Sequence, residues 1–185
     1  MTGQAQRAAS FSRGFPPVYS PGARILILGS LPGARSLEAR EYYAQPQNAF
    51  WRIMGALYGS GPELAYEARL ARLTEHAVAL WDVLAAGQRP GSLDSAIVRP
   101  TAVTNDFASF FERNPSLRSI CFNGATAAEL YRRKVLPALD SRFAAIPRRT
   151  LPSTSPAHAR MRFAEKLAHW SAALTPARDT GADQT

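Results

Sequence analysis

Cysteine is almost absent from the sequence, since Cys121 is the only one among 185 residues. A single thiol excludes an internal disulfide, a multi-cysteine zinc site and an iron–sulfur cluster, and it fits a reducing cytoplasm. The three histidines, His76, His158 and His169, lie far apart and form no H-E-x-x-H pattern. We therefore expect neither a metal nor another cofactor.

Long hydrophobic runs are missing as well. No apolar stretch approaches the roughly 20 residues that span a bilayer. Residues 1–17 lack the continuous apolar core of a secretory signal. Their arginines and serine without acids also resemble a transit peptide, but we interpret residues 1–21 as a flexible N-terminal arm. The sequence thus predicts a cytoplasmic protein without membrane contact.

Acidic residues are scarce, with 14 Asp and Glu against 22 Lys and Arg, which gives a net charge of +8. A basic surface attracts polyanions, of which nucleic acid is the commonest. The alternative is a protein that is basic without such a partner. Residues 148–162 favour nucleic acid, because they hold four arginines and one histidine and no acid.

Apolar runs alternate with helical segments along the rest of the chain. The predicted strands, the last interrupted by proline, cover 23–30, 77–84, 117–124 and 142–153. The predicted helices cover 35–44, 49–59, 62–75, 105–114, 125–136 and 157–174. Asn48 is the expected N-cap of the second helix, and Thr104 or Asn105 that of the fourth. This alternation predicts one α/β domain over 22–174 with a mostly parallel sheet, followed by a disordered tail over 175–185.

Ligands of such folds bind where the carboxyl ends of the strands and their loops converge. In this chain the rule selects the four loops 29–48, 82–92, 123–126 and 151–158. The sequence GSLPG in the first loop lacks the G-x-x-x-x-G-K-[ST] pattern, and Pro32 has no N–H to donate, so a triphosphate loop is excluded. A tight turn without a ligand is the alternative.

The stretch YYAQPQNAFW at 42–51 adds four aromatic residues and the carboxamide of Asn48 beside that turn. An aromatic face beside a polar amide suits a flat heterocycle, because stacking gives affinity and hydrogen bonds to its edge give selectivity. The hydroxyl residues of 151–158 suit phosphate oxygens. Together these features suit an enzyme that works on a base turned out of DNA.

Four segments carry a resemblance to a known family: ILILGSLPGARSLEAREYYAQPQNAFWRIMG, ALWDVL, CFNGATA and LPSTSPAHA. They resemble the uracil-DNA glycosylase superfamily, and within it the hypoxanthine-DNA (deoxyinosine) glycosylase branch, over about residues 22–174. The resemblance implies a three-layer sandwich with a central four-stranded sheet and a monomeric, metal-independent glycosylase. Such an enzyme hydrolyses the N-glycosidic bond of uracil or hypoxanthine in DNA and leaves an abasic site.

The resemblance also implies roles for individual residues. Mismatch-specific relatives carry a water-positioning asparagine where this chain has Leu31, and a leucine side chain cannot orient water. In the hypoxanthine branch the catalytic asparagine precedes "FW", which is Asn48 here. Tyr43 matches the aromatic residue that stacks on the base. Backbone N–H groups of the turn at Gly29, Ser30 and Leu31 are expected to donate to a carbonyl of the departing base.

Two residues at strand ends have competing interpretations. Asp82 lies where relatives read the base edge, and its carboxylate could accept an N–H of uracil or hypoxanthine; a helix cap or salt bridge is the alternative. Asn123 could face the pocket, or serve only the Asn-Gly turn that follows its strand.

The last loop is the expected DNA-binding segment. Its residues should approach the minor groove and the phosphates, or else form an ordinary N-cap of the last helix. We expect His158 to contact DNA, with a catalytic role as the alternative. The DNA-binding residues are Ser153, Thr154, Ser155, Pro156, His158, Arg149 and Arg160.

Three functions remain open at this point. The first is a DNA glycosylase for deaminated bases. The second is a noncatalytic binder of damaged DNA with the same fold, suggested by Leu31. The third is an enzyme of free nucleosides or nucleotides, which the acid-free segment 148–162 disfavours.

Overall fold

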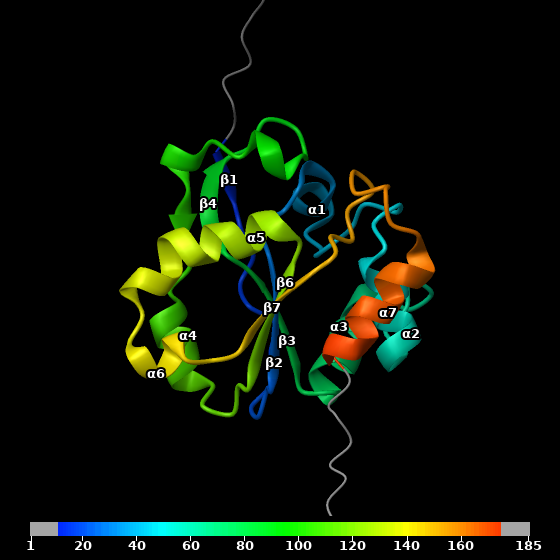
Figure 1. Ribbon diagram of the computed structural model, residues 1–185. Helices are drawn as coiled ribbons and strands as arrows, with labels where there is room; N and C mark the ends of the chain where they lie inside the picture. Colours follow the sequence, from blue (N-terminus) through cyan, green and yellow to red (C-terminus); the bar gives the residue numbers. More distant parts are fainter. Residues whose placement is uncertain (1–10, 175–185) are drawn as a thin grey trace, which may run out of the picture.

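A sheet of four parallel strands forms the middle layer of the computed structural model, which describes residues 11–174. Its strands are β2 (Ile25–Gly29), β3 (Val78–Asp82), β6 (Ser119–Asn123) and β7 (Arg148–Leu151), in the spatial order β3-β2-β6-β7 (Figure 1). All three ladders are parallel. β2, β3 and β6 are almost wholly buried, as expected for a parallel sheet covered on both faces. The predicted four-stranded parallel sheet is confirmed. Its last strand, predicted over 142–153, covers only 148–151, because Ser141–Ala144 form a helix before Pro147.

Helices on both faces of this sheet complete the predicted three-layer sandwich (Figure 1). One face carries α2 (Phe50–Tyr58), α3 (Tyr66–Glu75) and α7 (Phe163–Leu174), and the other carries α4 (Phe107–Arg113), α5 (Ala125–Leu130) and α6 (Ser141–Ala144). The shorter elements are α1 (Ala34–Ala39), η1 (Asp94–Ala96), η2 (Arg99–Thr101), the π-helix η3 (Tyr131–Val135) and η4 (Leu136–Ala138). Separate apolar clusters fill the two interfaces, so each face of the sheet has a core of its own.

A second, antiparallel sheet was not expected from the sequence. It consists of β1 (Phe11–Arg13), β4 (Leu84–Gln88) and β5 (Val103–Thr104), in the order β1-β4-β5. β4 follows β3 after a single residue, so the first part of the predicted loop 82–92 is a strand. Its sequence LAAGQ holds alanine and glycine, which are poor strand formers, and it is a strand through pairing with β1 and β5.

Residues 11–21 of the expected arm pack on the domain. β1 pairs with β4, the N–H of Gly14 donates to the carbonyl of Ala85 at 2.8 Å, and Val18 forms a bridge with Leu80. The expectations for residues 1–10 and for the tail at 175–185 lie outside the described residues. Among residues 11–174, no helix has both the length and the apolarity needed to cross a membrane.

Three helix boundaries differ from the prediction for local reasons. α1 stops at Arg40, whose φ of 57° is left-handed, instead of running to residue 44. The N-cap of α4 is Asp106, because its carboxylate accepts from the N–H of Ser109, and not Thr104 or Asn105. α7 starts at Phe163 instead of 157, where Glu165 accepts from the N–H of Arg162 at 2.8 Å in half of a capping box.

Trp170 of α7 ties the outer layer to the loop that follows β7. Its side chain is fully buried, and its Nε1 donates to the carbonyl of Pro152 at 3.0 Å. Pro152 has no N–H of its own and follows Leu151, the last residue of β7. The indole therefore fixes the path of the chain at the carboxyl end of the sheet.

We predict that Trp170→Phe lowers the free energy of unfolding by about 1–3 kcal/mol, because the half-buried Pro152 carbonyl loses the donor that the indole supplies. Urea unfolding measures this loss. His169→Ala, on the exposed side of the same helix, is the matched control and should unfold close to the parent. Equal unfolding of parent and Trp170→Phe would contradict the role of this hydrogen bond.

Candidate active site

A cavity of about 570 Å³ lies at the carboxyl ends of the parallel strands, where the loops were predicted to converge. The predicted residues that line it are Gly29, Ser30, Leu31, Tyr43, Asn48, Asp82, Asn123, Ser153, Thr154, Ser155, Pro156 and His158. Two predicted residues, Arg149 and Arg160, do not line it. The structure thus brings together twelve side chains or backbone segments from all four loops.

Gly29, the last residue of β2, allows the closest approach in the cavity. A Cβ built on it would lie 2.3 Å from Oδ1 of Asp82 and 2.9 Å from the hydroxyl of Tyr43. Both distances are shorter than real Cβ contacts, so a side chain at this position would displace one or both groups. The absence of a side chain at Gly29 therefore lets the carboxyl and the phenol meet over β2.

Asp82 ends β3 and is 4% exposed. Its Oδ2 has no hydrogen-bond partner within residues 11–174. Burial raises the pKa of Asp82 to about 7, while the positive charge of Arg89 opposes this rise and the negative charge of Asp94 adds to it. Near neutral pH the group can therefore accept as a carboxylate or donate as an acid.

Tyr43 is unusual for a tyrosine in its backbone conformation and in its buried hydroxyl. Its φ of 55° lies in the left-handed region, which is uncommon for a bulky residue and is found at functional sites. Its ring stacks on Phe50, with centroids 4.0 Å apart. The hydroxyl is buried and has no hydrogen-bond partner within the described part of the chain. Burial, reinforced by the charge of Asp82, raises the pKa of Tyr43 well above its usual value, so the phenol is a neutral donor.

Asn48 is half-buried, and its side chain lies on the wall of the cavity. Its Oδ1 accepts from the N–H of Phe50 at 3.0 Å, at the start of α2. Ala49 takes the N-cap position itself, so the expected cap is displaced by one residue, although the Asn48 side chain still bonds the first helical N–H. This bond fixes the orientation of the carboxamide. Among residues 11–174, one lone pair of Oδ1 and the Nδ2 group have no other partner.

Thr154 joins three elements around the cavity. Its N–H donates to Oδ1 of Asn123 at 2.9 Å, and its hydroxyl accepts from Nδ2 of the same side chain at 2.8 Å. Its carbonyl accepts from the N–H of Ala49 at 2.9 Å. Since Thr154 is 1% exposed, these bonds are shielded from water. The loop after β7 is thereby fixed to both β6 and the start of α2, next to Asn48.

The turn after β2 directs its carbonyl groups into the protein. The carbonyls of Gly29 and Ser30 accept from the N–H groups of Val83 and Leu84, and that of Leu31 accepts from Arg89. The N–H of Leu31 has no acceptor among residues 11–174, and the Leu31 side chain is buried in the core. The N–H of Leu31, a residue that lines the cavity, is therefore available as a donor. That the turn donates to a base stays a prediction.

An ion pair in the cavity wall was not predicted from the sequence; its Arg89 side chain is 7% exposed and its Asp94 side chain 32%. Arg89 Nη2 lies 2.8 Å from Oδ1 of Asp94, which also accepts from the hydroxyl of Ser30 at 2.6 Å. Arg89 lies in a loop that the sequence had selected, and Asp94 follows it by five residues. An arginine in a loop selected at the strand ends, with an aspartate five residues later, was the sequence signal that could have indicated this ion pair. Within residues 11–174, no three His, Cys, Asp or Glu side chains lie close enough to hold a metal ion.

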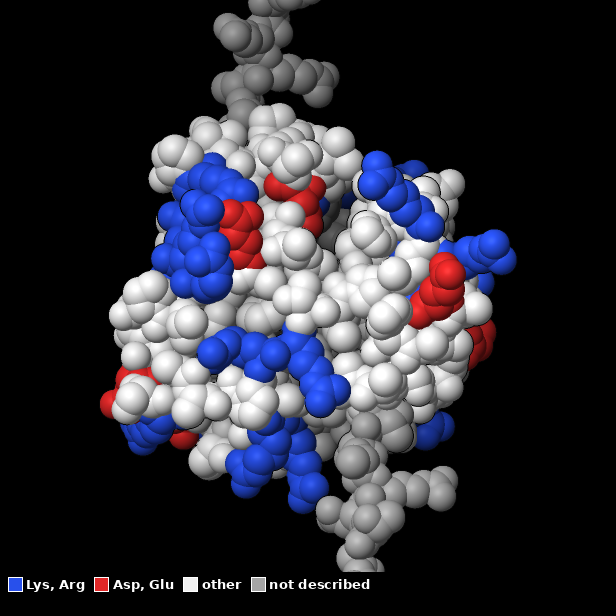
Figure 2. Space-filling view, in the orientation of Figure 1, with Lys and Arg blue, Asp and Glu red and all other residues white. Residues whose placement is uncertain are grey.

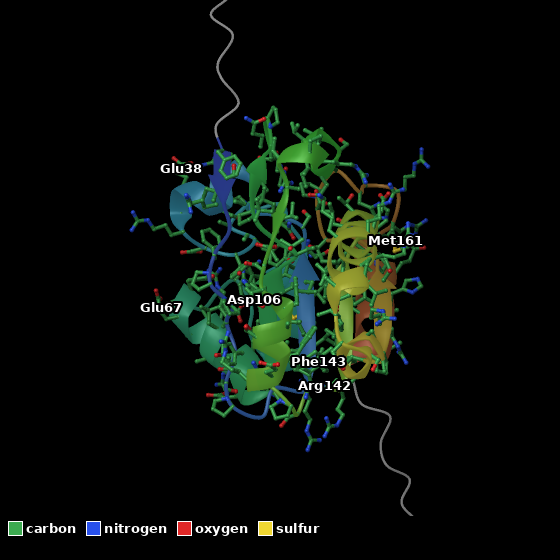
Figure 3. The ribbon with its side chains drawn as sticks, turned by 90° about the vertical axis from the view of Figure 1, so that its left-hand side faces the viewer. Glu38, Glu67, Asp106, Arg142, Phe143 and Met161 are labelled. Carbon is green, nitrogen blue, oxygen red and sulfur yellow. The ribbon has the colours of Figure 1, made fainter. Side chains whose placement is uncertain are left out.

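Basic side chains lie in several separate groups on the face drawn in Figure 2, with a hollow near its top. Arg149 donates to the carbonyl of Ala172 at 3.4 Å, in the last turn of α7, and Arg160 is exposed. Figure 3 shows Met161, the neighbour of Arg160 in the loop before α7, well separated from Arg142 and Phe143 on α6. Arg160 follows the cavity-lining His158 by two residues, whereas Arg149 is directed to α7. Of the two predicted arginines, Arg160 is therefore the one in the loop beside the cavity.

Comparisons with known proteins agree with this geometry. The family model described as "Uracil DNA glycosylase superfamily" matches residues 16–176. The chain is 44% identical over 135 residues to the hypoxanthine DNA glycosylase of Methanosarcina acetivorans, covering 68% of this chain and 84% of that one. It is 39% identical over 118 residues to the hypoxanthine DNA glycosylase of Methanosarcina barkeri, covering 63% and 73%.

A solved structure has the same fold. It is the solution NMR structure of a Methanosarcina acetivorans protein, a candidate uracil DNA glycosylase, with a TM-score of 0.73 and 40% identity. The match covers 89% of this chain and 97% of that one.

We predict that Gly29→Ala inactivates the site, because the added methyl group displaces the carboxyl of Asp82 or the hydroxyl of Tyr43. Overpacking of this kind costs about 1–3 kcal/mol of stability. Gly87→Ala is the matched control, since its Cβ would meet no atom closer than 3.5 Å. Base release and urea unfolding of both variants test this; full activity of Gly29→Ala would contradict the described floor of the cavity.

Proposed function

The chain belongs to the uracil DNA glycosylase superfamily, and on this basis we propose that it releases deaminated bases, hypoxanthine and/or uracil, from DNA. The observation that carries the proposal is a pair of buried polar groups without partners, Asp82 Oδ2 and the Tyr43 hydroxyl, in a cavity that also holds the Asn48 carboxamide. Buried polar groups without partners are rare in native proteins and call for a ligand or water.

The edge of hypoxanthine complements these groups. Its N1–H is a donor beside the O6 acceptor, so the Asp82 carboxylate can accept from N1 while the Tyr43 hydroxyl or the Leu31 N–H donates to O6. Uracil has the same donor between two carbonyl groups. The cavity of about 570 Å³ is in the usual range for small-molecule sites. A base inside a duplex reaches such a cavity only after the nucleotide is flipped out.

Hydrolysis then requires a water molecule on the sugar. The bond between C1′ and the base nitrogen breaks with its electron pair leaving on the base, while C1′ becomes cationic. The water oxygen bonds to C1′, and its proton ends on the departing base. In this proposal Asn48 holds the water, because its Oδ1 is oriented by the N–H of Phe50 and has a second lone pair. The backbone donors of the turn stabilise the negative charge on the base.

The loop 151–158 supplies the contact with DNA. Ser153, Ser155 and His158 line the mouth of the cavity, and Arg160 follows in the same loop segment. Hydroxyl groups and arginines bind phosphate oxygens, so affinity should fall as salt rises. Thr154 is buried and fixes the loop to Asn123 at the end of β6. We further propose that the enzyme acts as a monomer in the cytoplasm.

A noncatalytic binder of damaged DNA is the alternative that Leu31 suggests. Leu31 is 3% exposed, and its side chain cannot hold water. The placement of Asn48 in the cavity wall favours catalysis, because it supplies the carboxamide that Leu31 lacks.

We predict that Asn48→Ala slows base release on the order of 100-fold or more, because the water loses its positioning group. The measurement is single-turnover cleavage of oligonucleotides carrying uracil, hypoxanthine, xanthine or a mismatched thymine, followed by alkali to reveal abasic sites. No metal is added.

Gln47→Ala is the matched control, since this neighbouring carboxamide is exposed and lies outside the cavity. It should keep parental rates. An Asn48→Ala variant that cuts as fast as the parent would contradict the role of Asn48. Saturable binding of inosine DNA by the parent without base release would support the noncatalytic alternative instead.

A further inference from the structure

Arg89 and its contacts form a part of the cavity wall to which no role has been assigned so far. The Arg89 side chain is only 7% exposed. Its guanidinium donates to the carbonyls of Leu31 and Ser92 and pairs with Asp94 at 2.8 Å. These bonds join the loop after β4 to the turn after β2, and residues of both segments line the cavity.

The same loop is held at further points. Ser92 Oγ accepts from the N–H of Ala34 at 3.2 Å, at the start of α1, and the Ser30 hydroxyl donates to Asp94. The Nε of Arg89 donates to the carbonyl of Leu93 at 3.3 Å. One guanidinium therefore holds the carbonyls of Ser92 and Leu93 and the carboxylate of Asp94 against the turn that carries the N–H of Leu31.

Stability alone is a weak reason for this arrangement. An ion pair recovers little beyond the cost of removing its charges from water, and for buried pairs apolar replacements are often as stable. The pair lines the cavity and acts electrically on Asp82, whose Oδ2 has no partner. Its placement points to a role in the site.

We propose that Arg89 is a positioning residue for base recognition: its hydrogen bonds to the carbonyl of Leu31 and to residues 92–94 fix the turn that donates to the base. Its positive charge also favours the ionised form of Asp82 that accepts the base N–H, while the negative charge of Asp94 opposes that form. This inference rests on the proposed function, and it adds the residues that position the turn and set the charge of Asp82 for base recognition. The titratable groups that face Asp82 are Arg89, Asp94, Tyr42 and Tyr43. Both tyrosines are neutral, because burial raises the pKa of each well above the usual range, so the two charged neighbours set the balance.

The two charges make opposite predictions. Removing the positive charge of Arg89 raises the pKa of Asp82 further, so the carboxyl is protonated up to a higher pH. Removing the negative charge of Asp94 lowers that pKa. If base release needs ionised Asp82, activity rises with pH through the pKa of Asp82, which is about 7 in the parent.

The experiment measures single-turnover release of hypoxanthine from an inosine duplex as a function of pH. We expect the acid limb of Arg89→Met to move to higher pH and its maximal rate to fall on the order of 100-fold, because the turn loses its anchor. Asp94→Asn, which keeps an oxygen for Arg89 and Ser30, should move the limb to lower pH. Arg89→Lys should keep the limb near that of the parent while its maximal rate falls, since lysine keeps the charge but not the fork of donors.

Two further variants complete the test. Asp82→Asn should remove the limb, which identifies the titrating group. Arg99→Met removes one charge from a half-exposed pair with Glu129 outside the cavity, and its profile should match the parent.

Loss of rate in the Arg89 and Asp94 variants with an unmoved acid limb would overturn the inference, since a purely structural brace predicts that result. A parent that releases no base at any pH would contradict the proposed function instead. The two failures are therefore distinguishable.

Discussion

The hydrogen bonds of Thr154 are the interaction on which the site depends. Asn123, at the end of β6, accepts from the N–H of Thr154 and donates to its hydroxyl. The Thr154 carbonyl accepts from the N–H of Ala49. One residue thus sets the distance between the sheet, the loop after β7 and the helix that begins beside Asn48. Asn123 was predicted from the sequence either to face the pocket or to serve a turn. Its side-chain amide forms both of its hydrogen bonds in the described structure with Thr154.

The cavity combines this rigid frame with polar groups that the protein leaves unpaired. An unsatisfied buried group costs about 1–3 kcal/mol, so a ligand that pairs with such groups gains from satisfying them. Gly29 concentrates two such groups by letting Asp82 and Tyr43 approach the same point. A ligand with a donor beside an acceptor would relieve both, and the lactam edge of a deaminated base has this pattern.

The sequence was sufficient for the parallel sheet and for much of the site. The strand ILILG and the first four residues of VALWD carry no polar side chain, which identifies both strands as buried on both faces. The rule that ligands bind at the carboxyl ends of parallel strands then selects their loops. It was insufficient for β4, because LAAGQ has no strand pattern and pairs with β1, whose residues precede their partners by 73 to 77 positions. The ion pair of Arg89 and Asp94 was not predicted for the same reason, because its place in the site is set by tertiary contacts with Ser30 and Leu31. Asp106 was missed as a cap because three polar residues in a row, at 104–106, compete for that position.

The most direct test of the central claim is a crystal structure of the protein with a duplex that carries an uncleavable 2′-fluoro analogue of deoxyinosine. The account predicts the base in the cavity, its N1–H on Asp82, its O6 on Tyr43 or the turn, and a water molecule between Asn48 and C1′. A bound duplex whose inosine stays stacked in the helix, with Asp82 and Tyr43 still without partners, would contradict it.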